Sequence, residues 1–435
     1  MPDFILIGNG IAANSAAQRI HDLARDARIV MVTDEDEPYY SRCALMYYVM
    51  DHCKKSDIYI ADRRYYSEIG AELVVDVVAG VRAEESVVEF RDGGERRYDG
   101  LLIASGALPR RLGVPGEEAD GVFDFVTLAD ADAIRDRLKT ARRGVVIGGG
   151  LIGAEAVEVL YELGIAAEWL IREEYFYPIF CSRDQSLIVQ ERFTSHGVRV
   201  HTGRNIAGFE VSDDGNVAAV VDDHGESHPA DIVIRSIGVE PNIGFLEGSG
   251  IETGVGVKVD DHLRTNVANV WAAGDCAELC GQETGRPLIE KLWYTAQPQG
   301  WVAGENMAGG DATYRTVTQY QSAMFMDLDF CSYGEMPAPW NTYEGEVVDP
   351  ENGEDSLWLI HDGEVVVGAS FLGTALTKED IEHMVGERMP VARARALAER
   401  VLRPKRYDRA PVSRIAPKRR WSRRPNFWPA WLGGR

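Results

Sequence analysis

The sequence lacks the features that mark membrane, secreted and metal-cluster proteins. Its 435 residues contain no apolar run of about 18, so we expect no membrane span. Pro2 and Asp3 lead directly into an apolar segment, so we expect no signal peptide. The six cysteines form no CxxC pair and no metal-ligand spacing, which argues against an iron–sulfur cluster or any other metal site in this chain. Thiols of this kind predict a cytoplasmic protein.

The charge is strongly acidic but unevenly distributed. The net charge of −23 argues against nucleic acid as the main partner. Residues 403–435 contain eleven lysines and arginines and one acid, Asp408, so this tail carries +10 and the rest of the chain −33. Three tryptophans between residues 421 and 431 are interleaved with these cations, and aromatic residues and arginine are enriched at interface anchors. We predict that the tail docks onto a partner protein; the alternative is that it folds onto its own acidic body.

Residues 4–34 have the pattern of a strand, a glycine turn, a helix and a second strand followed by an acid. The first strand leads directly into a GxGxxA turn formed by Gly8, Gly10 and Ala13. Gly8 permits the tight turn, Gly10 lets the backbone approach a pyrophosphate, and Ala13 allows close packing of helix on strand. Asp34 lies where a carboxylate can accept both ribose hydroxyls. This predicts a dinucleotide-binding fold; a glycine turn in another kind of βαβ unit is the alternative.

Residues 145–171 repeat the pattern. Gly148, Gly150 and Gly153 form a complete GxGxxG after an apolar strand, and a helix to Leu163 and a further strand follow. Two such patterns in one chain predict an α/β protein with two Rossmann-like domains. Other strands are predicted at 101–106, 231–238 and 270–275, and helices at 129–138, 295–307 and 391–402. Residues 311–385 are predicted as strands with hairpin turns at Asn352-Gly353 and Asp362-Gly363, ending in a short helix from Lys378.

Four motifs together resemble those of the two-dinucleotide-binding flavoproteins, the FAD-dependent pyridine-nucleotide oxidoreductases. They are the first glycine turn with Asp34, the Ala104-Ser105-Gly106 strand end, GGGLIGAE, and Ala272-Ala273-Gly274-Asp275. The resemblance covers about residues 3–385 and is greatest to rubredoxin and ferredoxin reductases, nitrite-reductase flavin domains and NADH oxidases. It implies a discontinuous FAD-binding domain at 1–111 and 241–310 and an NAD(P)-binding domain at 112–240. A C-terminal α+β interface domain at 311–385 and a helix with the basic tail at 386–435 would complete the chain.

The resemblance also implies a set of site residues. Those for FAD are Gly8, Gly10, Ala13, Asp34, Ser105, Gly106, Gly274, Asp275, Glu290 and Trp293. Those for NAD(P) are Gly148, Gly150, Gly153, Glu155, Arg172 and Gly238. Glu155 would contact the nicotinamide region and is grouped with Arg42 and Cys43 as a catalytic candidate.

The choice between NAD and NADP depends on the end of the second strand in the second motif. Relatives that use NAD have an acid there, at the position that we assign to Ile171, and Arg172 follows as in NADP-dependent relatives. The second basic residue of those relatives is absent, with Pro178 near its place, and Glu173 and Glu174 would repel a 2′-phosphate. We therefore predict NAD(H) rather than NADP(H).

The early CxxxxC pair of the related disulfide reductases is absent, which argues against a dithiol relay. Residues 40–47, YSRCALMY, resemble two different family segments. In coenzyme A disulfide reductases and NADH oxidases the segment is SFxxCxLPY, and Cys43 would react at the flavin as a thiolate stabilised by Arg42. In rubredoxin reductases it is YSKPxL, and Cys43 would only pack beside the isoalloxazine. Cys276 and Cys280 are interpreted as packing residues.

Without a dithiol, electrons must be exchanged with something outside this chain. The tail favours an oligomeric complex in which iron–sulfur or other redox subunits are the partners. One such type resembles phenylglyoxylate dehydrogenase, a 2-oxoacid:NAD oxidoreductase with a flavin subunit of this build. The alternatives are a stand-alone rubredoxin or ferredoxin reductase, or an NADH oxidase or coenzyme A disulfide reductase using Cys43. A non-catalytic flavoprotein-fold scaffold is an alternative of another class.

Overall fold

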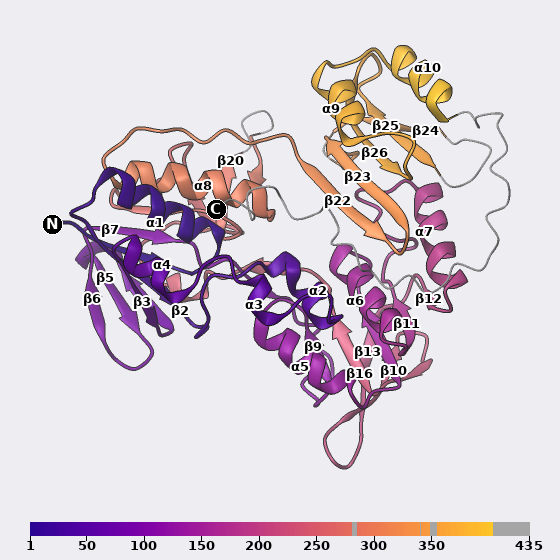
Figure 1. Ribbon diagram of the computed structural model, residues 1–435, viewed down its shortest axis with the longest axis horizontal. Helices are drawn as coiled ribbons and strands as arrows, with labels where there is room; N and C mark the ends of the chain where they lie inside the picture. Colours follow the sequence, from indigo (N-terminus) through magenta and orange to yellow (C-terminus); the bar gives the residue numbers. More distant parts are fainter. Residues whose placement is uncertain (281–284, 340, 349–354, 403–435) are drawn as a thin grey trace. The chain divides into compact units, whose positions relative to one another are not determined.

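The computed structural model describes residues 1–280, 285–339, 341–348 and 355–402 (Figure 1). They fall into two compact units, one formed by Met1–Pro178 with Val189–Gln319 and the other by Ile179–Ile188 with the described residues from Tyr320 onward. The predicted turn at Asn352-Gly353 and the basic tail lie outside the described residues. Among the described helices, none is long and apolar enough to cross a membrane.

The first unit contains a five-stranded parallel sheet with the order β19-β7-β1-β2-β3. Its strands are β1 (Asp3–Ile7), β2 (Arg28–Thr33), β3 (Ala71–Val75), β7 (Gly100–Ile103) and β19 (Val270–Ala272). The side chains from Phe4 to Ile7 are all buried, as expected for a parallel strand covered on both faces. Strand β19 closes the edge beside β7, so the sheet is completed by residues far along the chain.

Two glycines on α8 (Trp293–Met307) bring it against α1 (Ile11–Leu23), and Figure 1 shows the two helices side by side. A Cβ atom on Gly300 would lie 2.1 Å from the carbonyl oxygen of Ala12. One on Gly304 would lie 2.6 Å from the carbonyl oxygen of Ala16. The four-residue spacing of these glycines places both on one face of α8, so the two backbones can approach closely.

A second five-stranded parallel sheet in this unit has the order β12-β11-β10-β16-β9. Its strands are β9 (Val122–Asp124), β10 (Arg143–Ile147), β11 (Ala166–Leu170), β12 (Arg199–His201) and β16 (Ile232–Arg235). The associated helices are α5 (Leu128–Leu138) and α6 (Leu151–Glu162), whereas α7 (Arg183–Ser195) begins in the segment of the second unit and ends in the first. A three-stranded antiparallel sheet follows, formed by β13 (Ile206–Val211), β14 (Val217–Asp222) and β15 (Ser227–Pro229).

Short elements complete the first unit. The helical ones are η1 (Arg42–Ala44), α2 (Leu45–Val49), α3 (Lys55–Ile58), α4 (Arg63–Glu68), η2 (Ala83–Glu85) and η3 (Gly244–Leu246). The strands are β4 (Val78–Arg82), β5 (Val87–Phe90), β6 (Glu95–Arg97), β8 (Ala107–Pro109), β17 (Val239–Pro241), β18 (Val257–Val259), β20 (Ala277–Cys280) and β21 (Pro287–Leu288). β8 and β17 pair antiparallel, which holds together the two segments that run between the parallel sheets. The domain boundaries at 111, 240 and 310 stay predictions.

The second unit is built on an antiparallel sheet with the order β22-β23-β26-β25-β24. Its elements are β22 (Tyr320–Phe325), β23 (Leu328–Gly334), β24 (Glu344–Val348), β25 (Ser356–His361), β26 (Val366–Leu372), α9 (Lys378–Gly386) and α10 (Val391–Leu402). The predicted turn at Asp362-Gly363 is confirmed, since it connects β25 to β26. The fully buried Gln185 donates to the carbonyl oxygens of Ser356 (3.0 Å) and Ser370 (3.1 Å), which ties Ile179–Ile188 to this sheet.

Candidate functional site

The two glycine turns have the same backbone geometry. Gly8 and Gly148, which follow β1 and β10, have φ angles of +122° and +120°. A Cβ atom would lie 2.1 Å from the Ala104 carbonyl oxygen at Gly8 and 2.3 Å from that of Ser236 at Gly148. Both positions therefore require glycine, for backbone conformation and for space.

The second glycine of each turn leaves a helix N-terminus open. Gly10 and Gly150 are the N-caps of α1 and α6, and neither helix has a capping side chain or an acid in its first turn. Apart from the adjacent backbone, no atom of the described residues lies within 4 Å of a Cβ built on either glycine. Uncapped N–H groups and the positive end of the helix dipole attract anions. Both ends therefore fit the pyrophosphate group of a dinucleotide.

The third positions differ between the turns. Ala13 is fully buried, so a methyl group is accommodated in α1. At Gly153 a Cβ atom would lie 2.2 Å from the carbonyl oxygen of Gly148. The second turn is therefore the tighter of the two.

Backbone hydrogen bonds of the two glycine turns show which residues after β2 and β11 are equivalent. The Gly8 N–H donates to Val32 (2.7 Å), and the Gly148 N–H donates to Leu170 (2.9 Å), so these two acceptors are equivalent. Asp34 and Arg172 each lie two residues further on, so Arg172 is the counterpart of Asp34. The assignment of Ile171 to the position of the family's acid is therefore wrong. Ile171 is fully buried against Gly149 and corresponds to the buried Thr33.

Arg172 is exposed and already has a partner. Its guanidinium lies 2.6 Å from the Glu173 carboxylate. A cation at the counterpart of Asp34 would favour a 2′-phosphate, and the neighbouring carboxylate offsets that charge. The pair explains in electrostatic terms how NAD(H) is accepted despite the arginine.

Residues from four segments act on one another electrostatically within the first unit. Arg42 and Cys43 come from η1, Glu155 from α6, Asp275 from the turn after β19, and Lys291 from the segment before α8. The charges of Glu155 and Asp275 both raise the pKa of the Cys43 thiol. Arg42 and Lys291 both lower the pKa of Asp275, against the larger effect of burial. The structure thus brings three catalytic candidates together with one FAD candidate and adds Lys291.

Cys43 is not arranged to form a thiolate. Although the residue is accessible to solvent, desolvation by the surrounding protein and the charge of Glu155 raise its pKa to about 11. Arg42 does not stabilise a thiolate, because its guanidinium is bound to the Glu35 carboxylate (2.6 Å) and the Val126 carbonyl (2.8 Å). The expected pairing of Arg42 with a Cys43 thiolate is therefore wrong.

Glu155 lies in the first turns of α6, two residues after Gly153, and is half-buried. Desolvation raises the pKa of its carboxyl to about 7. The group can therefore hold or release a proton near neutral pH, which is where a group acting beside a reacting cofactor is most useful.

Gly274 and Glu290 are held by α8 and the segment after it. The Gly274 N–H donates to Gln299 Oε1 (2.7 Å). Gln299 Nε2 donates to Glu290 (2.9 Å), and the Tyr314 hydroxyl donates to the same carboxylate oxygen (2.6 Å). Glu290 therefore positions the Gly274 turn through Gln299. Trp293 is half-buried at the start of α8 and lies close to Tyr39.

The remaining candidates hold the segments that cross between the sheets. Ser105 Oγ donates to the Asn242 carbonyl (2.7 Å), and the Asn242 N–H donates to Gly106 (3.0 Å). The Arg110 N–H donates to the Gly238 carbonyl (3.0 Å). Cys276 is fully buried, in agreement with its interpretation as a packing residue, whereas the side chain of Cys280 lies outside the description.

Sequence reasoning missed several residues that build this site. They are Lys291, Gln299, Gly300, Gly304 and Tyr314. The four-residue spacing of Gly300 and Gly304 in a predicted helix was the available signal for close packing. Lys291 and Gln299 lie in residues 289–300, which resemble the family segment along the flavin pyrimidine, but only Glu290 and Trp293 were candidates there. Tyr314 had no signal.

Comparisons with known proteins agree with this geometry. Residues 2–300 match the family described as pyridine nucleotide-disulphide oxidoreductase. An NADH oxidase from Methanocaldococcus jannaschii is 30% identical over 343 residues, which are 76% of this chain and 75% of that protein. The NADH-dependent phenylglyoxylate dehydrogenase subunit epsilon from Aromatoleum evansii is 28% identical over 350 residues, 79% of this chain and 81% of that one. The solved structure of a NAD-dependent persulfide reductase from A. fulgidus has a TM-score of 0.81 and 26% identity, and the match covers 90% of this chain and 78% of that one.

Proposed function

The chain belongs to the pyridine nucleotide-disulphide oxidoreductase family, and from this premise we propose that it passes electrons between NAD(H) and an iron–sulfur partner protein. It is an FAD-dependent oxidoreductase of the NAD(H)-using kind. The finer proposal is that it serves as the flavoprotein subunit of a multi-subunit 2-oxoacid oxidoreductase. The matching subunit epsilon supports this assignment, because it aligns over four fifths of its own length.

The state of Cys43 carries the proposal that the acceptor is a separate protein. A pKa of about 11 keeps the thiol protonated at neutral pH, and the thiol form is neither a nucleophile nor a metal ligand. No second cysteine lies at the CxxxxC spacing to make an internal disulfide. Electrons that arrive from NADH therefore have no CxxxxC disulfide in this sequence to reduce.

The residues of the chain bind and position the cofactors. The amino ends of α1 and α6 offer free N–H groups to the two pyrophosphates, and Asp34 is placed to accept ribose hydroxyls. Glu155 can hold a proton at its carboxyl near neutral pH, and its charge acts on the Cys43 thiol. When bound, FAD would couple two-electron transfer from NADH to one-electron transfer to an iron–sulfur protein.

The basic tail is the proposed docking segment for the partner. Its +10 charge and three tryptophans suit an acidic protein surface, because arginine and aromatic residues are enriched among interface anchors and opposite charges favour association. We also propose a cytoplasmic location, on the basis of the free cysteines among the described residues.

Truncation at residue 402 tests the proposal. We expect the truncated protein to keep FAD and to reduce an artificial dye with NADH at the wild-type rate. The full-length protein is first purified from its native cell together with its partner chains. We expect the truncated protein neither to associate with these chains nor to transfer electrons to them. If co-purifying chains carry no iron–sulfur cluster, or if the truncated protein still assembles at native size, the partner proposal is wrong.

A stand-alone NADH oxidase is the second candidate, because the Methanocaldococcus relative carries that name and Cys43 is accessible to solvent. Oxygen consumption with NADH as the only other substrate distinguishes the two. A rate equal to the dye-reduction rate would favour the oxidase, and a rate near zero favours the partner protein. Bleaching of the flavin by NADH under anaerobic conditions would exclude a non-catalytic scaffold.

A further inference from the structure

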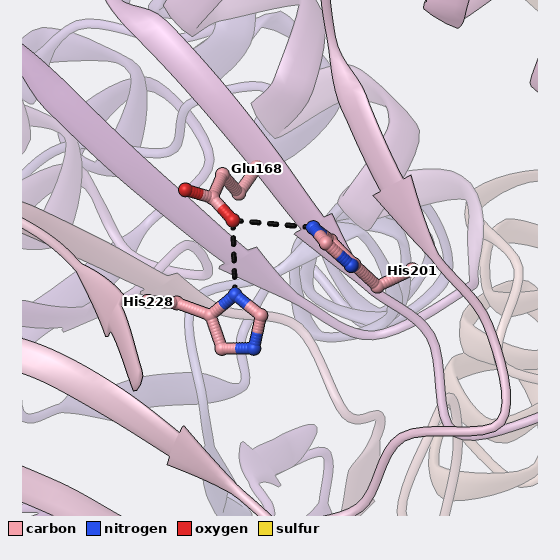
Figure 2. A group of neighbouring side chains, drawn as sticks. All are labelled: Glu168, His201 and His228. Carbon is pink, nitrogen blue, oxygen red and sulfur yellow. Dashed lines mark hydrogen bonds and ion pairs between the residues drawn. The ribbon is translucent and has the colours of Figure 1, made fainter. Parts of the chain in front are cut away.

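Two histidines and a glutamate form a group outside the dinucleotide candidates, in which Glu168 and His228 are buried and His201 is half-buried (Figure 2). Glu168 comes from β11, His201 from β12 and His228 from β15, so the group joins the second parallel sheet to the three-stranded sheet. Glu168 Oε2 lies 2.9 Å from His228 Nδ1 and 3.2 Å from His201 Nε2. One nitrogen or oxygen from each residue lies within 4.8 Å of the other two.

These separations match the ligand spacing of a tetrahedral zinc site. Zinc bonds of about 2.0–2.2 Å to histidine nitrogen and carboxylate oxygen place neighbouring ligand atoms about 3.3 Å apart. The two measured distances, 2.9 and 3.2 Å, are within a few tenths of an ångström of that value. Two imidazoles and one carboxylate are also a ligand set that proteins use for zinc with the fourth position open.

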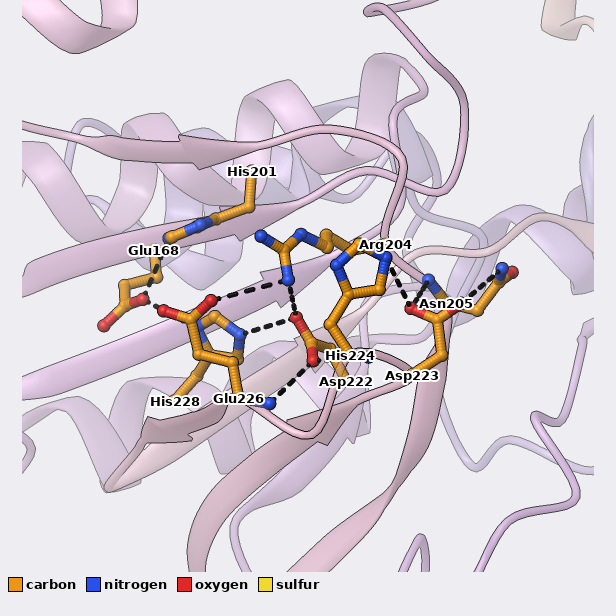
Figure 3. Close-up of polar contacts among 9 residues, drawn as sticks. All are labelled: Glu168, His201, Arg204, Asn205, Asp222, Asp223, His224, Glu226 and His228. Atoms are coloured by element: carbon orange, nitrogen blue, oxygen red, sulfur yellow. Dashed lines mark hydrogen bonds and ion pairs between the residues drawn. The ribbon is translucent and has the colours of Figure 1, made fainter.

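A second layer of contacts orients the three side chains (Figure 3). The other nitrogen of His228, Nε2, faces Asp222 Oδ2 at 3.4 Å, and Asp222 is in turn bound by Arg204 (2.6 Å). The other oxygen of Glu168 is paired with Arg199. A ligating histidine that donates its second N–H to a carboxylate is the usual support of a protein metal site.

His228 is 1% exposed, and a carboxylate oxygen faces each of its nitrogens. His201 Nε2 is aimed at the same Glu168 oxygen as His228 Nδ1, so one ligand atom from each residue lies in the same small region. The His201 side chain, 21% exposed, gives solvent a route to the fourth position.

From this geometry we propose that Glu168, His201 and His228 bind one divalent transition-metal ion of the zinc class. The ion joins strands from two sheets and stabilises the fold around the second dinucleotide motif. The proposal does not depend on the identity of the electron acceptor, since the site shares no residue with the cofactor candidates named above.

The proposal is tested by titrating Zn²⁺ into the FAD-loaded protein, which is first treated with a chelator and dialysed. We expect one Zn²⁺ to bind per chain, Mg²⁺ not to compete, and affinity to fall between pH 7.5 and 5.5 because protons displace the metal from imidazole. His201→Gln should weaken Zn²⁺ binding by about 100-fold or more. His224→Gln is the matched control, because His224 is an exposed neighbour with no ligand role, and it should bind Zn²⁺ like the wild type.

Flavin content and NADH-to-dye activity of both variants establish that they are folded. Zn²⁺ should also raise the thermal unfolding midpoint of the wild type and of His224→Gln, and leave that of His201→Gln unchanged. Equal Zn²⁺ affinity in folded His201→Gln and wild type would overturn the proposal. Absence of saturable binding to the wild type would do the same.

Discussion

Replacement of Glu155 by glutamine should stabilise the protein much more at pH 8 than at pH 5. Desolvation raises the pKa of this carboxyl from 4.5 to about 7. Because the folded state then binds the proton more tightly than the unfolded state, the contribution of Glu155 to stability falls as the pH rises from about 4.5 to about 7 and is constant above that. Over pH 5 to 8 this loss amounts to about 2.5 kcal/mol, and glutamine, which does not ionise, avoids it.

Urea unfolding at the two pH values measures the effect as a difference between Glu155→Gln and the wild type. Taking the difference cancels the contributions of all other titrating groups, which both proteins share. Glu162→Gln on the same helix is the matched control, because Glu162 is exposed, and its difference from the wild type should be the same at both pH values. If the advantage of Glu155→Gln changed by less than about 0.5 kcal/mol between pH 5 and 8, the desolvation argument would be refuted.

Three further predictions concern packing, thiol chemistry and nucleotide choice. Gly300→Ala should lower the free energy of unfolding in urea by about 1–3 kcal/mol and reduce FAD content, because its Cβ would lie 2.1 Å from the Ala12 carbonyl oxygen. Gly386→Ala is the control, because a Cβ there meets no described atom within 4 Å beyond the local backbone. Equal stability of the two variants would contradict the close approach of α1 and α8. Cys43→Ser should leave the rate of anaerobic flavin reduction by NADH within about twofold of wild type in stopped flow, since the thiol is protonated, and a large loss would restore a reactive Cys43. Glu173→Gln should release Arg172 and raise the kcat/KM ratio of NADPH to NADH by about tenfold, and an unchanged ratio would show that the pair does not set nucleotide preference.

The parts of the fold that depend on local pattern were predictable from the sequence. Each glycine turn lies between an apolar strand and a helix, and steric demands at Gly8 and Gly148 leave glycine as the only choice. The strand at 270–275 was also predicted because a short apolar run ends in an acid. Local rules were sufficient because each motif lies within about thirty residues, although the atoms that crowd Gly8 and Gly148 belong to Ala104 and Ser236.

The rest depends on contacts between distant residues, which a single sequence does not reveal. The counterpart of Asp34 was placed one residue too early, at Ile171 instead of Arg172. β11 ends at Leu170, and only the hydrogen bonds of the two turns show that Arg172 is equivalent to Asp34. The high pKa of Cys43 depends on burial and on Glu155, more than a hundred residues away. Glu168, His201 and His228 are isolated polar residues in three strands, and no spacing rule joins them.

The discontinuity of the first parallel sheet has a consequence for synthesis of the chain. Strands β1, β2, β3 and β7 are complete at Ile103, but their edge partner β19 begins at Val270. At translation rates of ~5–20 residues per second, the interval is on the order of ten to thirty seconds. During that interval the β7 edge and the face of α1 that α8 later covers are unpaired, while all strands of the second sheet have emerged by Arg235. The later-encoded sheet is therefore the first that can finish folding, and the nascent N-terminal strands are the part most in need of chaperone protection.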